Sequence, residues 1–314
     1  MLFVAIDFVN IDPLILIENL FEGVLMRVLI FGATGMLGHA MAEYFALEPN
    51  YQVWGVCRSV NTQNMGYLNR VSLLTEVDFL DVHRLKNVIT DVRPDIVINC
   101  VGVIKQAIKS TNPLEAIPIN SLFPHLLANL CESAGARLIH ISTDCVFSGD
   151  RGMYTESDTE DARDLYGRSK LLGEVDYPHA ITLRTSIIGH ELNSTRSLID
   201  WFLSQTGEIQ GYQKAIFSGV PAVELAQIVK NYVIPFPSMR GLYHVSADPI
   251  SKYDLLTLVS REYLSNIRII PNDVFIMNRS LDSSRFRLAT GFIPKPWESM
   301  IHEMHNFRLL PKVK

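Results

Sequence analysis

The sequence predicts an α/β fold: a doubly wound parallel sheet with helices on both faces, joined to a second, smaller α/β lobe. Two observations predict it. From Arg27 onward, short β-branched apolar runs alternate with amphipathic helical stretches, as in successive βαβ units. The chain of 314 residues is also long enough for one large α/β unit or for two interleaved domains.

The expected elements follow one another along the chain. Each apolar run is short enough for a buried strand, and each stretch between runs has apolar residues at the three-to-four spacing of a helix packed on a sheet. Strands are expected at 27–31, 51–57, 95–102, 136–142, 180–186 and 241–247, and helices at 36–47, 82–92, 120–134 and 165–175.

The domain organisation changes after about residue 187, where the alternation weakens and prolines punctuate shorter elements. We therefore expect a sheet domain at 26–187 and a smaller lobe at 188–314. A helix at about 222–234 and the strand at 241–247 are regular enough to rejoin the sheet. The two units are thus expected to be interleaved, with about 222–248 returning to the first.

Residues 1–25 are strongly apolar, yet they resemble neither a signal peptide nor a membrane anchor. The stretch has no Lys or Arg, carries four acidic residues and is broken by Pro13. Met26 is followed directly by an expected strand. We interpret 1–25 as an N-terminal extension, either dispensable or a packing arm.

Charge and cysteine content exclude several classes of protein. The net charge of -5 is modest and its signs are mixed, without the basic stripe that nucleic acids or anionic membranes require. The four cysteines lack metal-site spacing and are typical of reduced thiols in a cytoplasmic protein. We expect a small-molecule ligand, no metal, no nucleic acid and no membrane partner. The oligomeric state stays open, with a homodimer as one option.

A glycine-rich turn, GATGMLG, directly follows the first expected strand and opens the first helix. Glycines there permit a tight turn and close approach to a pyrophosphate, which the helix N-terminus also favours. The alternative is a capping turn with chance glycines. The predicted dinucleotide-binding residues are Gly32, Thr34, Gly35, Met36, Leu37 and Gly38, with Cys100, Val101 and Gly102 at the end of the strand expected at 95–102.

The end of the second expected strand indicates which dinucleotide is bound. NAD sites usually carry a carboxylate about twenty residues after the glycines, whereas this chain has Arg58, whose guanidinium suits a 2′-phosphate. NADP(H) is therefore preferred, with NAD(H) as the alternative and a solvated surface residue as the other interpretation of Arg58. Asp78 and Phe79 could flank an adenine, or equally cap a helix and fill the core.

Tyr166 and Lys170 in DLYGRSKLLGE lie four residues apart on an expected helix, so they share one face. An adjacent ammonium favours the phenolate and brings the pKa of a tyrosine toward the working range of a proton donor. The lysine can also bind the nicotinamide ribose, and we count both Tyr166 and Lys170 among the predicted cofactor-binding residues. On its own, such a pair is also typical of a surface helix.

STDCVFSG strengthens the prediction, because it follows the strand expected at 136–142, at the edge where ligands bind. The Thr143 hydroxyl can hydrogen-bond a substrate carbonyl beside Tyr166. The plain alternative is that Ser142 and Thr143 cap a turn. Asn120 could complete a proton relay behind Lys170, or serve only as an N-cap.

The combination of GATGMLG, STDCVFSG, YGRSK, LRTS and GLYHVSA resembles the extended short-chain dehydrogenase/reductases, and among them the dTDP-4-dehydrorhamnose reductase group. The resemblance covers nearly everything from Met26 onward and implies a Rossmann domain with a substrate-binding lobe. It implies that Thr143, Tyr166 and Lys170 are catalytic. The implied reaction is reduction of a 4-keto sugar nucleotide by NADPH or NADH.

Two positions depart from relatives of this group. Related dehydratases carry a glutamate where this chain has Cys145, so dehydration is disfavoured. Cys145 is then a packing residue, with a thiolate base as the alternative. The group usually has an aromatic residue after RTS, whereas this chain has Ile187, which we expect to contact the substrate. The sugar pocket therefore differs.

Two arginines of the smaller lobe, Arg279 and Arg285, are candidates to hold a substrate diphosphate, or are structural ion-pair partners. Among the histidines, His140 and His244 are interpreted as core residues rather than ligands, and the roles of His125 and His190 stay open.

The leading hypothesis is an NAD(P)H-dependent reductase of a nucleotide-activated 4-keto-6-deoxyhexose, serving deoxysugar or polysaccharide synthesis. The alternatives are an epimerase or dehydrogenase acting on the same ligand class, and a non-catalytic NADP-binding regulatory subunit like that of methionine adenosyltransferase. The intact Thr143, Tyr166 and Lys170 argue against the regulatory subunit.

Overall fold

The computed structural model describes residues 25–59, 70–103, 112–192 and 194–310. Within them a seven-stranded parallel sheet has the order β11-β6-β5-β4-β1-β2-β3. Its strands are β1 (Met26–Phe31), β2 (Tyr51–Val56), β3 (Ser72–Leu74), β4 (Ile96–Asn99), β5 (Arg137–Thr143), β6 (Ala180–Thr185) and β11 (Gly241–His244). The direction of winding reverses between β1 and β4, which is the position where doubly wound sheets bind ligands.

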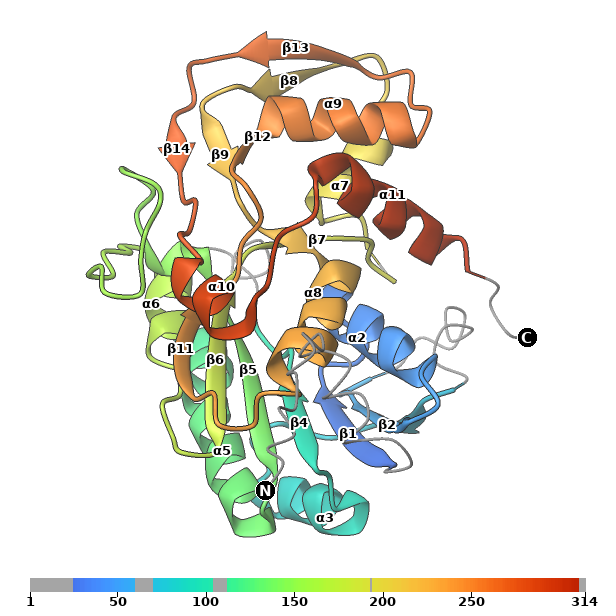
Figure 1. Ribbon diagram of the computed structural model, residues 1–314, viewed down its shortest axis with the longest axis vertical. Coiled ribbons are helices and arrows are strands. Elements are labelled where there is room, and N and C mark those ends of the chain that lie inside the picture. The colour runs from blue at the N-terminus through green and yellow to red at the C-terminus, as the bar shows by residue number, and fades with distance from the viewer. Residues whose placement is uncertain (1–24, 60–69, 104–111, 193, 311–314) are drawn as a thin grey trace, which may run out of the picture.

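Side chains of β1 alternate between two buried cores, one on each face of the sheet. Val28 and Ile30 pack in the core on the side of α2 (Met36–Ala46) and α8 (Ala222–Ile228). Leu29 and Phe31 pack in the other core, against α3 (Val82–Val92) and α5 (Phe123–Ala134). Figure 1 shows these helices flanking the sheet. A strand buried on both faces reads as a continuous apolar run, as RVLIF does.

The expected strands and helices are largely found where the sequence placed them. The sheet strand outside the expected ranges is β3, which has three residues. The helix expected from 120 starts earlier, with α4 (Pro113–Ala116) and a π-helical segment at Ile117–Leu122 that leads into α5. The helix expected at about 222–234 likewise ends in π-helical geometry at Val229–Val233.

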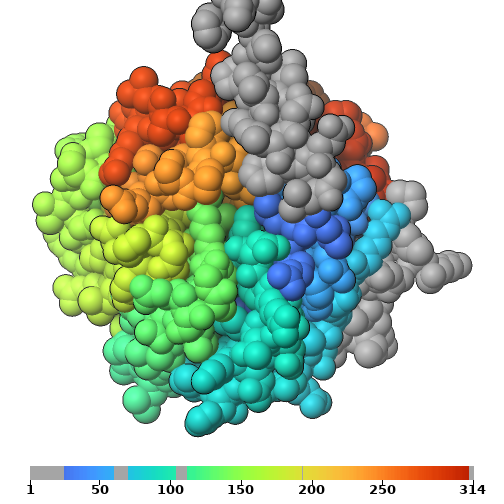
Figure 2. All heavy atoms as spheres, turned by 60° about the horizontal axis from the view of Figure 1, so that its bottom comes forward, coloured from blue at the N-terminus to red at the C-terminus, as the bar shows by residue number. Residues whose placement is uncertain are grey.

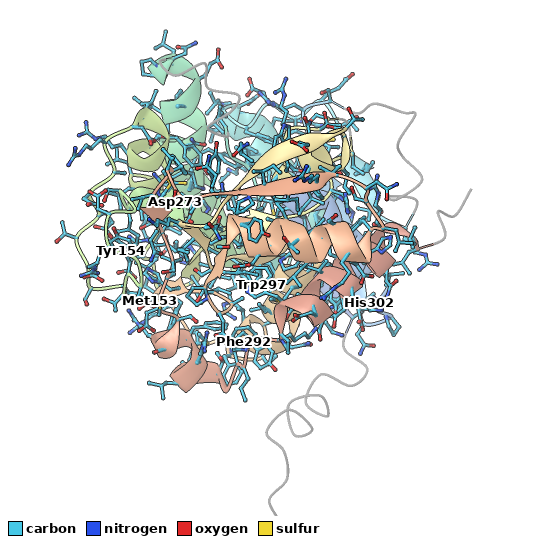
Figure 3. All side chains as sticks on the ribbon, turned by 90° about the horizontal axis from the view of Figure 1, so that it is seen from above. Met153, Tyr154, Asp273, Phe292, Trp297 and His302 are labelled. Atoms are coloured by element: carbon cyan, nitrogen blue, oxygen red, sulfur yellow. The ribbon has the colours of Figure 1, made fainter. Side chains whose placement is uncertain are left out.

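The smaller lobe lies over the carboxyl ends of the sheet strands (Figure 1), and from above α9 and the β8/β13 pair cross the top of the molecule (Figure 3). Tyr154, from the loop after β5, bridges to Leu281 of this lobe. The remaining elements are α6 (Leu165–Leu171), β7 (Ile187–Ile188), α7 (Leu198–Leu203), β8 (Glu208–Tyr212), β9 (Ala215–Phe217), β10 (Val220–Pro221), β12 (Ile250–Ser251), α9 (Lys252–Glu262), β13 (Arg268–Asn272), β14 (Met277–Asn278), α10 (Ser284–Thr290) and α11 (Trp297–Arg308), with a 3-10 turn at Asp144–Val146.

The chain returns to the sheet through β11, which pairs in parallel with β6 from Gly241 to His244. Figure 2 shows this orange part of the chain against the yellow-green part that contains β6. The proposed domain boundaries remain an interpretation, and residues 1–24 of the expected N-terminal extension lie outside the described residues. Among the described helices, none has the length and apolar character needed to cross a membrane.

Candidate active site

The glycine-rich turn connects β1 to α2 at the point where the winding reverses. Gly32 adopts a φ of +84°, and the Gly35 N–H donates to its carbonyl at 2.9 Å. A Cβ on Gly38 would lie 2.0 Å from the Gly32 oxygen, so the first turn of α2 packs directly on the turn. The N-cap Gly35 offers no side-chain cap, which leaves N–H groups of α2 available to a phosphate.

The other predicted dinucleotide-binding residues surround this turn. Thr34 and Met36 are half-buried, and Leu37 is buried beneath them. Cys100 and Val101, at the end of β4, lie against Gly32: a Cβ there would be 3.2 Å from the Cys100 carbonyl and from Val101 Cγ2. Gly102 is exposed next to them. The structure thus brings the two predicted segments together, and the cradle fits a pyrophosphate.

Replacing Gly38 with alanine is expected to abolish dinucleotide binding and to destabilise the fold by about 1–3 kcal/mol, because the methyl group must displace the turn. Fluorescence titration with NADP(H) and thermal denaturation check both effects. Gly207→Asn is the control, because its φ of +73° suits asparagine and an added Cβ meets no heavy atom within 4 Å. Unchanged binding in Gly38→Ala would refute the assignment of the turn.

Three residues, Arg58, Asp78 and Phe79, were expected at the adenosine end of the dinucleotide, and the structure places them differently. Arg58 is exposed directly after β2. Phe79 is buried with its ring stacked on Phe123 at 5.3 Å, so it fills the core. Asp78 is exposed and accepts from Leu80 N at 3.0 Å, while the N-cap of α3 is Asp81. The capping alternative for Asp78 is therefore wrong, because the N-cap of α3 lies three residues later.

The three predicted catalytic residues meet at the carboxyl end of β5. Thr143 is the last residue of this strand and accepts from Cys145 N at 3.1 Å. Tyr166 and Lys170 lie one turn apart on α6. This helix can approach the Thr143 loop because residue 167 is glycine: a Cβ there would be 2.2 Å from the Cys145 carbonyl oxygen.

Burial controls the protonation of the tyrosine and the lysine. Burial raises the pKa of Tyr166 above its usual range, and the nearby Thr143 hydroxyl only partly offsets this. The direction is opposite to the lowering of the Tyr166 pKa that we expected Lys170 to cause. Burial also lowers the pKa of Lys170 to about 8, against the opposing influence of Glu174. Lys170 Nζ donates to the Ile141 carbonyl at 2.8 Å, which leaves two N–H groups for a ligand.

Asn120 lies within the π-helical segment and is fully buried, so the N-cap alternative is wrong. Its amide donates to Ser169 Oγ at 3.1 Å and to the Val103 carbonyl at 3.1 Å, and its oxygen accepts from Val103 N at 2.8 Å. Ser169 precedes Lys170 on α6. Asn120 therefore connects α6 to the loop after β4, and its part in a proton relay remains a proposal.

Cys145 is a poor candidate for a catalytic base. Burial, reinforced by the adjacent Asp144, raises the pKa of this thiol to about 12. A thiol of this kind stays protonated near neutral pH and cannot abstract a proton as a thiolate. The packing interpretation of Cys145 is favoured.

Of the residues expected to bind the substrate, Arg279, Arg285 and Ile187 lie in three different surroundings. Arg279, following β14, reaches the loop after Thr143, where its Nε donates to the Phe147 carbonyl at 2.9 Å. Arg285 is exposed on α10 and stacks over the Tyr243 ring at 4.6 Å, so its observed contact is structural. Ile187 is half-buried in β7, which pairs with β10.

The four histidines that the sequence analysis considered differ in burial and in their contacts. His140 and His244 are fully buried, and His244 Nδ1 lies 3.0 Å from the Tyr154 carbonyl oxygen. His190 lies between Asp200 and Tyr263, at 2.6 and 2.7 Å, and His125 contacts Tyr177 at 3.0 Å. In the ranges that the structure describes, no group of His, Cys, Asp and Glu is arranged to hold a metal.

Sequence reasoning missed a buried ion network below the site. Arg184 of β6 is 1% exposed and binds both oxygens of Glu174, at 2.7 and 2.6 Å, as well as Glu160. Glu174 also accepts from Ser142 Oγ at 2.6 Å, next to Thr143. A charged residue inside the apolar run AITLRTS is the signal that could have revealed it, because a buried arginine needs carboxylate partners.

The sheet topology and these motifs define the class of the protein as an extended short-chain dehydrogenase/reductase. A family model described as the RmlD substrate binding domain matches residues 26–307, and the chain belongs to this family.

Two kinds of protein are similar to this chain in amino-acid sequence. The chain is similar to methionine adenosyltransferase 2 subunit beta of Xenopus tropicalis, with 27% identity over 292 residues, 88% of this chain and 80% of that protein. It is also similar to dTDP-4-dehydrorhamnose reductase of Aggregatibacter actinomycetemcomitans, with 24% identity covering 90% of this chain and 99% of that protein.

Solved structures share the fold. The dTDP-4-dehydrorhamnose reductase of Bacillus anthracis str. Ames, in complex with NADP, matches with a TM-score of 0.71 and 22% identity, covering 90% of this chain and 99% of that one. WbmG of Bordetella bronchiseptica, in complex with NAD, matches with a TM-score of 0.71 and 17% identity, covering 91% and 94%.

Proposed function

We propose that this protein is an NAD(P)H-dependent reductase of a nucleotide-activated 4-keto-6-deoxyhexose. The observation that carries the proposal is the convergence of Thr143, Tyr166 and Lys170 at the sheet edge next to the glycine-rich turn. A bound nicotinamide dinucleotide supplies the hydride for such a reduction. The phosphate cradle is formed by the Gly32 turn and the start of α2, with Arg58 favouring NADP(H).

The protein's own groups manage the proton and the charge at the carbonyl oxygen. Tyr166, kept protonated by burial, donates a proton to this oxygen as it becomes an alkoxide. The Thr143 hydroxyl lies beside Tyr166 and donates to Asp144 Oδ1 at 3.3 Å. When a substrate is bound, this hydroxyl turns from Asp144 to the carbonyl oxygen and donates a second hydrogen bond that stabilises the developing charge. The Lys170 ammonium orients the ribose with its two remaining N–H groups.

The test is NADPH oxidation by purified protein against 4-keto-6-deoxyhexoses carried on dTDP, UDP and GDP. Turnover with one of them identifies the reaction and the substrate. Conversion of a hexose without net NADPH consumption would favour an epimerase, which the same three residues can support. Tight NADP(H) binding without turnover would contradict both enzymatic functions.

A regulatory subunit is the second candidate, because the chain also resembles methionine adenosyltransferase 2 subunit beta over most of its length. Size-exclusion chromatography with a methionine adenosyltransferase catalytic subunit tests it. A stable complex together with the absence of turnover would favour regulation over catalysis.

The pH dependence of NADPH use follows from Lys170. Its pKa of about 8 lies below the usual value for lysine, so the ammonium is present below about pH 8 and is lost as the pH rises through this value. We expect kcat/KM for NADPH to fall about tenfold per pH unit above pH 8, because binding of the ribose requires the charge. Initial rates from pH 6 to 10 check this, and a flat profile to pH 10 would contradict it.

A further inference from the structure

Two polar side chains, Asn99 and His140, face each other inside the apolar sheet. Asn99 ends β4 and His140 lies in the middle of β5, and the parallel register of these neighbouring strands pairs the two residues (Figure 1). Both side chains are fully buried. They lie on the same face of the sheet as Val97 and Leu138, which belong to the core that packs against α3 and α5. Polar groups in such a core lower the stability of the fold unless their hydrogen bonds are made.

The hydrogen bonds of Asn99 determine which nitrogen of His140 carries the proton. Val101 N donates to Asn99 Oδ1 at 3.0 Å, so the other end of this amide, Nδ2, is a donor. Nδ2 lies 3.1 Å from His140 Nδ1, which must therefore be the acceptor. Burial lowers the pKa of His140 well below its usual range, so the ring is neutral and its proton is on Nε2.

The second ring nitrogen of His140 lacks such a contact. Among the residues that the structure describes, no group accepts from the buried Nε2–H. A buried donor without an acceptor lowers the stability of the fold, which an apolar side chain of similar size would not do. Packing therefore does not explain a histidine at this position, and the contact with Asn99 is the one that a histidine makes and an apolar residue would not.

Asn99 links His140 to the predicted dinucleotide-binding residues. Its Oδ1 holds the N–H of Val101, two residues further along the chain. Val101 in turn lies against the glycine-rich turn, where a Cβ on Gly32 would be 3.2 Å from Val101 Cγ2 and from the Cys100 carbonyl. The orientation of the Asn99 amide thus sets the position of the chain beside this turn.

The other end of the same segment is also held by a buried amide. Asn120 accepts from Val103 N at 2.8 Å and donates to the Val103 carbonyl at 3.1 Å. Gly102, which is exposed, lies between the two points of attachment. Asn120 is itself held by a serine of α6, and Asn99 is held by His140.

We propose that His140 is a positioning residue for dinucleotide binding. It holds the Asn99 amide in the orientation that fixes Val101 beside the glycine-rich turn, without contacting the ligand itself. The inference rests on the proposed function for the place of the dinucleotide. When residue 140 no longer accepts, the Asn99 amide can rotate and the Val101 N–H loses its acceptor. The ligand must then order the end of β4 as it binds, which lowers its affinity.

The test compares substitutions that keep one ring nitrogen or the other. An asparagine at position 140 places an amide oxygen near the position of Nδ1, whereas a glutamine reaches the position of Nε2. We expect His140→Asn to keep the affinity for NADP(H) within about threefold of the wild type, and His140→Gln and His140→Leu to lower it at least about tenfold. Fluorescence titration measures the affinity, and urea denaturation of each variant measures its stability.

The double variant Asn99→Leu/His140→Leu separates positioning from stability. It removes both polar partners, so its stability is expected to exceed that of His140→Leu, in which the Asn99 amide is left unpaired. Its affinity for NADP(H) is expected to match that of His140→Leu, because the two residues act as one unit. Hydrogen exchange at the Val101 N–H should be faster in both variants than in the wild type and in His140→Asn.

His244→Leu is the matched control, because His244 is also a fully buried histidine of the sheet, but it lies on the edge strand β11 and contacts the Tyr154 carbonyl. We expect it to lose stability and to keep its affinity for NADP(H). Equal affinities of the wild type, His140→Gln and His140→Leu overturn the proposal, as does an affinity that follows stability across all the variants, the control included. A wild type that binds no NADP(H) overturns both this proposal and the proposed function, whereas binding without turnover contradicts the reductase alone.

Discussion

Replacing Tyr166 with phenylalanine is expected to lower kcat at least about a hundredfold while NADP(H) still binds. The change removes one oxygen from a side chain that is largely buried between α6 and the Thr143 loop, so it deletes the proposed proton donor with little change in packing. Because the cofactor cradle is built on other elements, β1, α2 and the end of β4, dinucleotide affinity should be retained. Stopped-flow NADPH oxidation and a separate fluorescence titration measure the two effects.

Tyr177→Phe is the matched control, since the Tyr177 hydroxyl contacts His125 on the surface rather than the site. We expect its kcat to equal that of the wild type. A Tyr166→Phe enzyme with undiminished kcat would show that another group donates the proton. Loss of NADP(H) binding in the same variant would indicate instead that Tyr166 holds the cofactor.

Replacing Arg184 with methionine is expected to have the largest effect on stability, lowering the free energy of unfolding by about 3–5 kcal/mol. The variant would leave Glu174, whose side chain is 11% exposed, without its bidentate partner in a buried position. It would also remove the stacking of the guanidinium over Phe147 at 5.3 Å. Urea denaturation followed by fluorescence gives the free energy of unfolding.

Arg268→Met provides the comparison, because Arg268 also pairs with a glutamate, Glu208, but at 73% exposure. Exposed pairs contribute about 0–1 kcal/mol, so this variant should unfold close to the wild type. Equal stabilities of the two variants would mean that burial does not set the strength of the Arg184 network. A secondary loss of activity in Arg184→Met is expected, because Glu174 also positions Ser142, next to Thr143.

The sequence predicted correctly those strands in which nearly every side chain is buried. The strands β1, β2, β4, β5 and β6 are continuous apolar runs because both faces of the sheet are covered, and such runs are visible without a structure. The sequence did not predict β3, because its three residues, Ser72–Leu74, are too few to show a pattern of apolar residues. It also missed the π-helical segment at Ile117–Leu122, which differs from an α-helix by its backbone hydrogen bonds rather than its composition.

The candidate site also contains residues that the sequence could predict and residues that it could not. The glycine-rich turn and the Tyr166/Lys170 pair were predicted because their spacing is local, within one turn and one helix. Thr143 was predicted because it follows an expected strand at the edge where ligands bind. Arg279 and Arg285 lie in one short segment and looked alike, yet one reaches the Thr143 loop and the other stacks on Tyr243. Sequence spacing cannot separate them, because the direction of each side chain depends on which elements pack around it.

By itself, the sequence determined the fold class, because apolar runs and helical periodicity are local properties of the chain. It also predicted the glycine-rich turn and the candidate catalytic residues, which stay predictions. Only the tertiary structure decided the raised pKa of Tyr166, the lowered pKa of Lys170, the buried contact of Asn120 with Ser169 and the contact of Arg279 with the loop after Thr143. Those properties arise from burial and from contacts between segments far apart in the chain. Desolvation and long-range charge are set by the packing of the whole molecule.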